Sequence, residues 1–435
     1  MKIASLGQPR WRSLVLGAVI VWSGWLAWQR WSEPRWQGRN VAEWFREFQL
    51  SPSRNLRNGR EALQALAALK DHSGPFLIHH AQTIGEFSPF FKATAWVSHK
   101  APRPLLSPLG PLLARLERQA ELELDRPVTA RRALGELRLP AKLLLQVRPA
   151  LSDPNPIQQL KAIQILGTAG SGAEECVPLL TPFLGSTNPS LSQSALRSIS
   201  ELGEASAAAV PELIRLLAFP ESPGVTFATL KALGRIGPKA APALPAIRAW
   251  GTPGAATNRF TIRQAALSAL AIDPGQIWAS DWLRTRLDSG VLSHFTTFTN
   301  VAALFVPELW HWAEGSELEE WLLSVDLLNQ LKLDPNRLIQ TVERRLASAA
   351  PGSDDELNSV HRLFLLQPEH PEALRIMIRH LQSADPIWVL GVLQNSVVGA
   401  ETSSLLPEVR KLMVAPNPEI QRQAKQTWFE LTGQP

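Results

Sequence analysis

Two segments, ISELGEASAAAVPELI (residues 199–214) and ALGRIGPKAAPALPAI (residues 232–247), are variants of one pattern, and TAGSGAEECVPLL (residues 168–180) is a third. Gly170, Gly203 and Gly237 are spaced by 33 and 34 residues, and Pro178, Pro211 and Pro245 repeat both intervals. A fixed period of this length is typical of stacked-repeat proteins. The stretch from Ile163 to Trp250 therefore predicts one helical hairpin written three times.

Apolar residues follow the same period, as in the column Leu166/Ile199/Leu233. We expect this column to form the core between stacked hairpins, because one hairpin alone cannot bury both faces of its helices. The glycine after each first helix suits a left-handed C-terminal turn. The proline that follows suits the first turn of the second helix, where its missing N–H costs no hydrogen bond.

The rest of the chain reads as further helices. Asn155-Pro156, Asn188-Pro189 and Asn417-Pro418 each place a capping side chain before a proline that opens a helix. No long alternation of β-branched residues occurs, so we expect an all-α chain, an α-solenoid of stacked hairpins. The expected parts are a membrane anchor (1–32), a capping helix and linker (33–55), a first repeat with an irregular insertion (56–127), regular repeats (128–294), and divergent helical repeats with a C-terminal cap (295–435).

The N-terminus has the layout of a membrane-targeting segment. Lys2, Arg10 and Arg12 precede an uncharged run from Ser13 to Gln29, which would rise about 25 Å as a helix. That length is at the short end of what crosses a bilayer. We expect a single-pass anchor over residues 11–31, with a cleaved signal peptide or a buried soluble helix as alternatives. Because long domains translocate largely regardless of flanking charge, we expect the body to be extracytoplasmic.

Charge is unevenly distributed along the 435 residues. Residues 1–150 carry 22 basic and 11 acidic side chains, residues 151–260 carry 8 and 7, and residues 261–435 carry 14 and 21. Nucleic-acid binding requires Lys and Arg concentrated on the binding surface. The regular repeats are nearly neutral, so no nucleic-acid partner is expected. The basic excess lies beside the predicted anchor, where anionic lipid is its simplest partner.

The repeated unit resembles the HEAT-repeat family, on ALGRIGPKAAPALPAI (residues 232–247) and its two parallels quoted above. The whole arrangement is similar to bacterial membrane-anchored HEAT-repeat proteins of unassigned function. The match is good over residues 128–272, fair over 56–88 and poor over 295–435. The Asp and Arg of the best-known eukaryotic HEAT consensus are not regularly placed here. The resemblance implies a HEAT-like superhelix of paired antiparallel helices that acts as a binding scaffold.

No motif in the sequence calls for catalysis, a cofactor or a metal, and Cys176 is the only cysteine. We therefore expect a non-catalytic, membrane-anchored scaffold that binds protein partners through its solenoid surface. The alternatives are an enzyme or enzyme subunit on a HEAT-like scaffold, of the lyase or nucleic-acid-acting type, and a protein that binds lipid surfaces. Trp310, Trp312 and Trp321 are candidate partner contacts, since tryptophan is enriched at binding hot spots. Simple packing of these three rings is the alternative.

Overall fold

The computed structural model describes residues 34–50, 57–82, 125–219, 222–252, 258–395 and 403–432. Within these ranges the chain is helical, and the only β-type pairing is an isolated bridge between Trp36 and Arg39. The prediction of an all-α fold is confirmed. The predicted anchor lies outside the described residues, as do residues 83–124, which make up most of the predicted first repeat and its irregular insertion (56–127). In the part of the chain that is described, no helix has the length and hydropathy to cross a bilayer.

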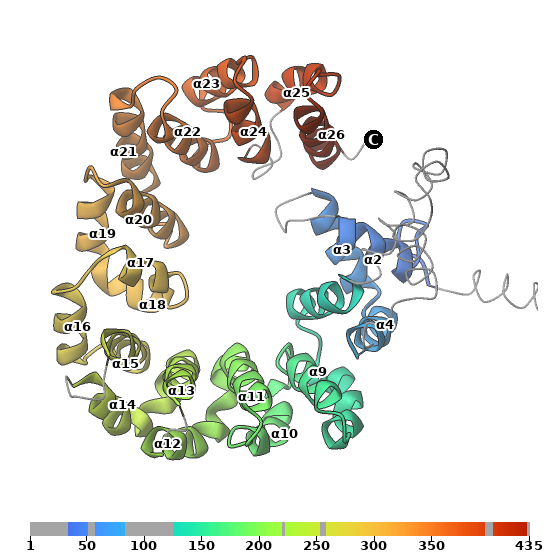
Figure 1. Ribbon diagram of the computed structural model, residues 1–435, viewed down its shortest axis with the longest axis vertical. Coiled ribbons are helices and arrows are strands. Elements are labelled where there is room, and N and C mark those ends of the chain that lie inside the picture. The colour runs from blue at the N-terminus through green and yellow to red at the C-terminus, as the bar shows by residue number, and fades with distance from the viewer. Residues whose placement is uncertain are drawn as a thin grey trace, which may run out of the picture.

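The helices are arranged as a ring of hairpins with an inner and an outer layer (Figure 1). The N-terminal helices are α2 (Val41–Leu50), α3 (Arg57–Ala68) and α4 (Lys70–Gln82), followed by a helix over 125–137, α8 (Ala141–Leu144) and a 3₁₀ segment, η1 (Leu145–Ser152). The last helix, α26 (Pro418–Thr432), contacts α3. The first and last described repeats therefore meet, and the solenoid comes full circle.

The regular repeats pair a longer inner helix with a shorter outer helix. The inner helices are α9 (Pro156–Leu166), α11 (Pro189–Leu202), α13 (Pro223–Ile236) and α15 (Arg259–Ile272). The outer helices are α10 (Val177–Leu180), α12 (Val210–Ala218), α14 (Leu244–Gly251) and α16 (Ile277–Arg284). Each inner helix contacts the next one along the chain from α9 to α15. The predicted period thus corresponds to one hairpin.

The C-terminal half keeps the same two layers although its sequence period has decayed. Its elements are α17 (Ser289–Phe295), α18 (Thr299–Ala302), α19 (Val306–Ala313), α20 (Leu318–Gln330), α21 (Pro335–Ser348), α22 (Asp354–Leu366), α23 (Pro371–Leu381), α24 (Pro386–Asn395) and α25 (Leu406–Leu412), before α26. In Figure 1, α20, α22, α24 and α26 line the inside of the ring, and α19, α21, α23 and α25 lie outside.

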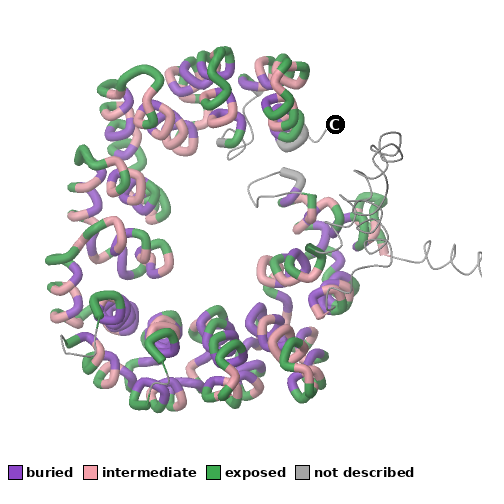
Figure 2. The backbone as a smooth tube through the Cα atoms, viewed as in Figure 1, coloured by how far each residue is buried: buried purple, intermediate pink, exposed green. Residues whose placement is uncertain are grey.

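The core is a continuous seam between the two layers, visible as the buried residues in Figure 2. Leu166, Ile199 and Leu233 are each 0% exposed, which confirms the predicted apolar column. The capping helix α2 joins this seam through Trp44, Phe45 and Phe48, and it packs on α3. Burial of these rings covers one end of the first hairpin, as the first unit of a stack requires.

Helix starts follow the sequence prediction closely. The side chains of Asn155, Asn188 and Asn417 each accept a backbone N–H two residues on, at 2.9, 3.0 and 2.9 Å, and proline occupies the first helical position in each case. Asn40 and Glu43 form a reciprocal capping box, with both N–H···O distances 2.9 Å. Local chemistry therefore sets these boundaries, which explains why sequence and structure agree there.

The prediction of a left-handed turn at every repeat glycine is only partly correct. Gly203 (φ 61°, ψ −129°) and Gly237 (φ 71°, ψ −144°) have positive φ but lie outside the left-handed helical region, in backbone space essentially reserved for glycine. A 3₁₀ segment follows each of them, η4 (Gly203–Ala209) and η5 (Gly237–Ala243). Gly170 has no positive φ, and the left-handed turn of its repeat falls on Gly172 (φ 72°, ψ 18°).

Candidate functional site

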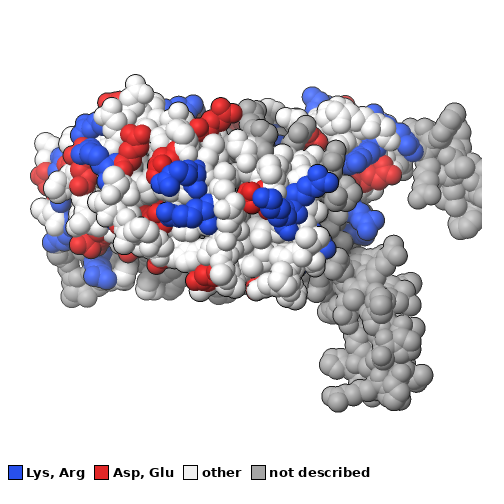
Figure 3. Space-filling model, turned by 90° about the horizontal axis from the view of Figure 1, so that it is seen from above, with Lys and Arg blue, Asp and Glu red and all other residues white. Residues whose placement is uncertain are grey.

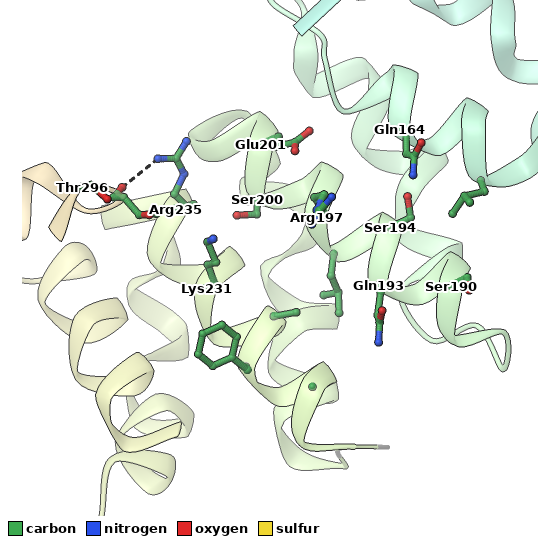
Figure 4. Close-up of a pocket in the computed structure, with 16 residues that line it drawn as sticks. Gln164, Ser190, Gln193, Ser194, Arg197, Ser200, Glu201, Lys231, Arg235 and Thr296 are labelled. Atoms are coloured by element: carbon green, nitrogen blue, oxygen red, sulfur yellow. Dashed lines mark hydrogen bonds between the residues drawn. The ribbon is translucent and has the colours of Figure 1, made fainter. Parts of the chain in front are cut away.

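The inner helices of the regular repeats enclose a groove of about 870 Å³, with residues 296–297 at one end (Figure 4). A smaller adjoining groove of about 430 Å³ extends toward the helix over 125–137. The two share the side chains of Gln164, Arg197 and Glu201. Together they form one open channel, which we call the inner groove, across four consecutive inner helices.

The inner groove is lined by solvent-facing positions of these helices, and equivalent positions recur with the repeat. Arg131, Gln164, Arg197 and Lys231 are 33, 33 and 34 residues apart and occupy the same place on successive helices. Six basic and two acidic side chains line the two parts of the groove (Arg131, Arg132, Arg138, Arg197, Lys231, Arg235; Glu136, Glu201). Basic side chains therefore occupy this row on three of the four helices, with Gln164 between Arg131 and Arg197.

Two of the groove cations bridge repeats through backbone carbonyls, whereas Arg131 Nε donates to the carbonyl oxygen of Pro127 in its own helix at 3.4 Å. Arg138 Nη1 donates to the carbonyl oxygens of Glu201 and Ala169 at 3.2 and 3.4 Å. Arg235 Nη1 donates to the carbonyl oxygen of Thr297 at 3.2 Å, the bond drawn in Figure 4. Each guanidinium links helix ends that are about 60 residues apart in sequence, because a partial negative charge collects at helix C-termini. These two arginines brace the groove.

Arg197 and Lys231 differ from the bracing arginines. In the described chain no hydrogen bond or ion pair engages either side chain. Arg197 comes from α11 and Lys231 from α13, and both extend into the groove in Figure 4. Their charges are available to a ligand without breaking an existing pair.

Glu201 is the acidic group closest to these cations. Partial desolvation by the groove walls raises its pKa, and the opposing charges of Arg197, Arg138, Arg235 and Lys231 pull it back down. Its side chain keeps contact with the solvent inside the groove. Glu201 therefore offsets part of the positive potential of the channel without forming a close ion pair.

Two polar atoms in the groove are buried without a partner. Gln164 Oε1 and Ser194 Oγ have no hydrogen bond to any described protein atom. Figure 4 shows the two side chains facing each other between α9 and α11. Leaving a buried polar atom unpaired costs about 1–3 kcal/mol, so a ligand that supplies partners would recover that free energy.

The excess positive charge of the regular repeats lies on their inner layer. The inner helices α9, α11 and α13 carry Lys161, Arg197, Lys231 and Arg235 with Glu201 as their one acidic residue. The outer segments carry both signs, with the acidic Glu174, Glu175, Glu204 and Glu212 beside the basic Arg215, Lys239 and Arg248. The near-neutral composition of these repeats therefore hides a basic inner face.

The outer surface of the C-terminal repeats has a different charge pattern. Figure 3, which views the ring from the side of these repeats, shows Lys and Arg interspersed with Asp and Glu. Arg375 pairs with Glu372 at 2.5 Å and Lys411 with Glu408 at 2.7 Å. Arg375 and Lys411 thus have acidic partners on this face, unlike Arg197 and Lys231 in the inner groove.

Residues 141–218, which include α9 to α12, match a family model for HEAT repeats. This stretch is similar to HEAT repeats. It includes Arg197 and Glu201, so the central part of the inner groove lies within the matched residues. A comparison with curated proteins found no match.

Several solved structures resemble the chain at low identity. An engineered protein from a structural genomics programme is 15% identical, with 90% of this chain and 98% of that chain covered and a TM-score of 0.28. A mutant of Kap121p is 13% identical, with 90% and 48% covered and a TM-score of 0.30. Kap95p with RanGDP is 13% identical, with 90% and 46% covered and a TM-score of 0.24. The chain thus spans about half the length of Kap121p and Kap95p, and TM-scores this low carry no argument about function.

The three tryptophans proposed as partner contacts lie beyond the matched HEAT repeats, and two of them are buried. Trp321 is 0% exposed, with the guanidinium of Arg345 at 4.6 Å from its ring centre. Trp310 is 8% exposed, and the guanidinium of Arg337 covers its ring at 4.1 Å. Trp312 is half-buried. The partner-contact role remains a prediction, which burial restricts to Trp312.

Sequence reasoning did not find the groove residues of the HEAT repeats. When each helix is considered alone, the groove residues resemble ordinary exposed or polar helix positions. These residues are Gln164, Ser194, Arg197 and Lys231. The available signal was the period itself: polar residues recurring at the same place in successive repeats mark a shared surface, as apolar residues mark a shared core.

Proposed function

We propose that this protein is a non-catalytic scaffold that holds protein partners along the inner face of its solenoid. The observation that carries the proposal is the inner groove, which crosses several repeats and presents unpaired cations from neighbouring helices. Repeat solenoids offer extended concave surfaces that suit long, shallow contacts with a partner chain. A groove open along its length is also unlike the enclosed pockets in which small ligands are mostly buried.

The nucleic-acid-acting alternative also needs a basic channel, and the inner groove is basic. Other groups in the groove fit poorly, however. Glu136 and Glu201 lie among its cations, where they would repel phosphates. The unpaired acceptor Gln164 Oε1 requires a donor, which a peptide N–H supplies and a phosphate group does not. We therefore propose protein rather than nucleic acid as the partner.

A photocrosslinking experiment in cells tests the scaffold role. A photoreactive amino acid at Gln193, exposed in the groove, should capture one or a few discrete proteins from the native environment. The same amino acid at Lys239, exposed on η5, is the matched control. An identical set of products from both positions, or no protein product from Gln193, would argue against a partner on the inner face.

We also propose that residues 11–31 anchor the protein in a membrane with its body outside the cytoplasm, on the strength of the sequence pattern alone. The full chain should stay with the membrane fraction after alkaline carbonate treatment, and a chain lacking residues 1–32 should be released. A reporter fused after Pro435 should be active only outside the cytoplasm. Cytoplasmic activity would reverse the orientation, and carbonate release of the full chain would exclude the anchor.

A further inference from the structure

We infer that the inner groove binds an extended acidic segment of a partner protein, with carboxylates three residues apart engaging Arg197 and Lys231. The inference rests on the proposed scaffold function and specifies the chemistry of its partner. Both cations are unpaired, and they sit at equivalent positions of adjacent inner helices. The occupant should therefore present negative charges at the spacing of the repeats.

That spacing selects an extended chain. Adjacent packed helices are about 8–10 Å apart. A chain in the extended polyproline II conformation advances about 3.1 Å per residue and presents every third side chain on the same face. Three residues therefore span about one repeat. A segment that crosses α11 and α13 with Asp or Glu at positions i and i+3 would place one carboxylate on Arg197 and the next on Lys231. Intervals of two or four residues would fall short of the second cation or overshoot it.

The unpaired polar atoms of the groove fit the backbone of such a segment. Gln164 Oε1 can accept a peptide N–H, and Ser194 Oγ can accept an N–H or donate to a carbonyl oxygen. Both lie on the α9 side of Arg197. A segment that continues from Arg197 toward Arg131 would pass over these atoms, and Arg131 would meet a third acidic residue two repeats away from Arg197. Charge at the cations and hydrogen bonding at Gln164 and Ser194 then act on one ligand.

A substitution of Glu201 tests the inference through an expected gain in affinity, which a misfolded variant would not show. Glu201 lies one helical turn after Arg197 on α11 and lowers the positive potential that an acidic ligand meets. Replacing its carboxylate with a neutral amide of the same shape should strengthen binding. Replacing Arg197 or Lys231 with glutamine should weaken it.

The experiment measures fluorescence anisotropy of labelled synthetic peptides with the full chain. One peptide carries Asp at positions i, i+3 and i+9, and isomers of identical composition carry the first pair at i, i+2 or i, i+4. We expect the i, i+3 peptide to bind most tightly. Arg197→Gln and Lys231→Gln should each weaken it roughly two- to fivefold, the range of a partly exposed charge pair. Glu201→Gln should tighten it by a similar factor.

Lys239→Gln removes one positive charge from the exposed 3₁₀ segment η5 and serves as the matched control. Equal affinity for all three isomers, or an equal loss in Lys239→Gln, would overturn the inference. Tighter binding of a single-stranded oligonucleotide than of any peptide would assign the groove to nucleic acid and overturn it too. If Gln193 crosslinks a protein but these peptides show no preference, the scaffold function stands and the acidic-segment inference fails.

Discussion

The carbonyl oxygen of Arg138 lies so close to Gly170 that a Cβ added to the glycine would be 2.0 Å away from it. Gly170 N–H also donates to the carbonyl oxygen of the next residue, Leu139, at 2.8 Å. Two hairpins therefore touch here through their backbones, without side chains between them. Only glycine fits, because the obstacle is backbone that cannot rotate away.

Gly170→Ala should destabilise the protein by about 1–3 kcal/mol or more, the usual cost of overpacking a site that cannot yield. Gly135→Ala is the contrasting control, since its new Cβ would make an ordinary 3.9 Å contact with Thr168. That helical change should stabilise the protein by up to about 1 kcal/mol. Urea unfolding measures both, and a shift of the same sign in the two variants would contradict the close contact.

A substitution of Gly237 tests the effect of its backbone conformation separately from steric crowding. The nearest atom to an added Cβ is 3.9 Å away, so Gly237→Ala should cost about 1–3 kcal/mol from backbone strain alone. Asparagine tolerates the left-handed helical region better than alanine does. Because ψ at Gly237 is −144°, Gly237→Asn should give no rescue. An asparagine variant clearly more stable than the alanine variant would show that the turn is an ordinary left-handed one.

His361 should make the protein sensitive to acid. Burial, together with the charge of Arg362, lowers the pKa of His361 from 6.5 to about 4. Between pH 4 and pH 6.5, His361 is protonated in the unfolded chain and neutral in the folded chain. The neutral His361 therefore makes its full contribution to the free energy of unfolding above pH 6.5, and this contribution is lost as the pH falls toward 4.

His361→Gln removes the imidazole that takes up this proton in the unfolded chain. The difference between the urea midpoints at pH 7 and pH 5 should therefore become smaller. The decline should persist in part, since burial also lowers the pKa of His80 and His294. His311→Gln changes an exposed histidine and should leave the difference as in the parent protein. An unchanged difference in His361→Gln would mean that this histidine is not buried in the neutral form.

Alanine substitutions should distinguish the core tryptophan Trp321 from the more exposed Trp312 by their effect on stability. Trp321→Ala should cost about 3–5 kcal/mol, the range for removing a fully buried aromatic side chain. Trp312→Ala should cost less, because the ring is only partly buried, and a partner contact there would appear as reduced capture of that partner. Urea unfolding and pull-down yields check the pair. Equal losses of stability would remove the case for a surface role of Trp312.

Much of the fold could be predicted because it depends on local signals. Asn155, Asn188 and Asn417 cap helices through bonds to residues two positions away. The apolar column that contains Leu233 could be predicted from the repeat period alone. The conformation at Gly203 and Gly237 was harder, because positive φ alone does not determine ψ.

The inner groove could not be predicted from net charge, because charge counts ignore which face a residue occupies. Lys231 on α13 and Glu204 on η4 cancel in a sum but lie on different layers of the solenoid. The unpaired Gln164 and Ser194 likewise depend on how α9 packs against α11, a contact between residues about 30 positions apart. Such properties belong to the stack rather than to any one hairpin.

Contact between α26 and α3 has a consequence for how a long partner would leave. A chain bound to an open solenoid can dissociate through the gap between the two ends of the array. Inside a closed ring it can leave only through the two open faces of the ring, or after α26 and α3 separate. The dwell time of a bound partner would then depend on a contact between the two ends of the array, and substitutions at the α3–α26 contact would change its release without altering the groove.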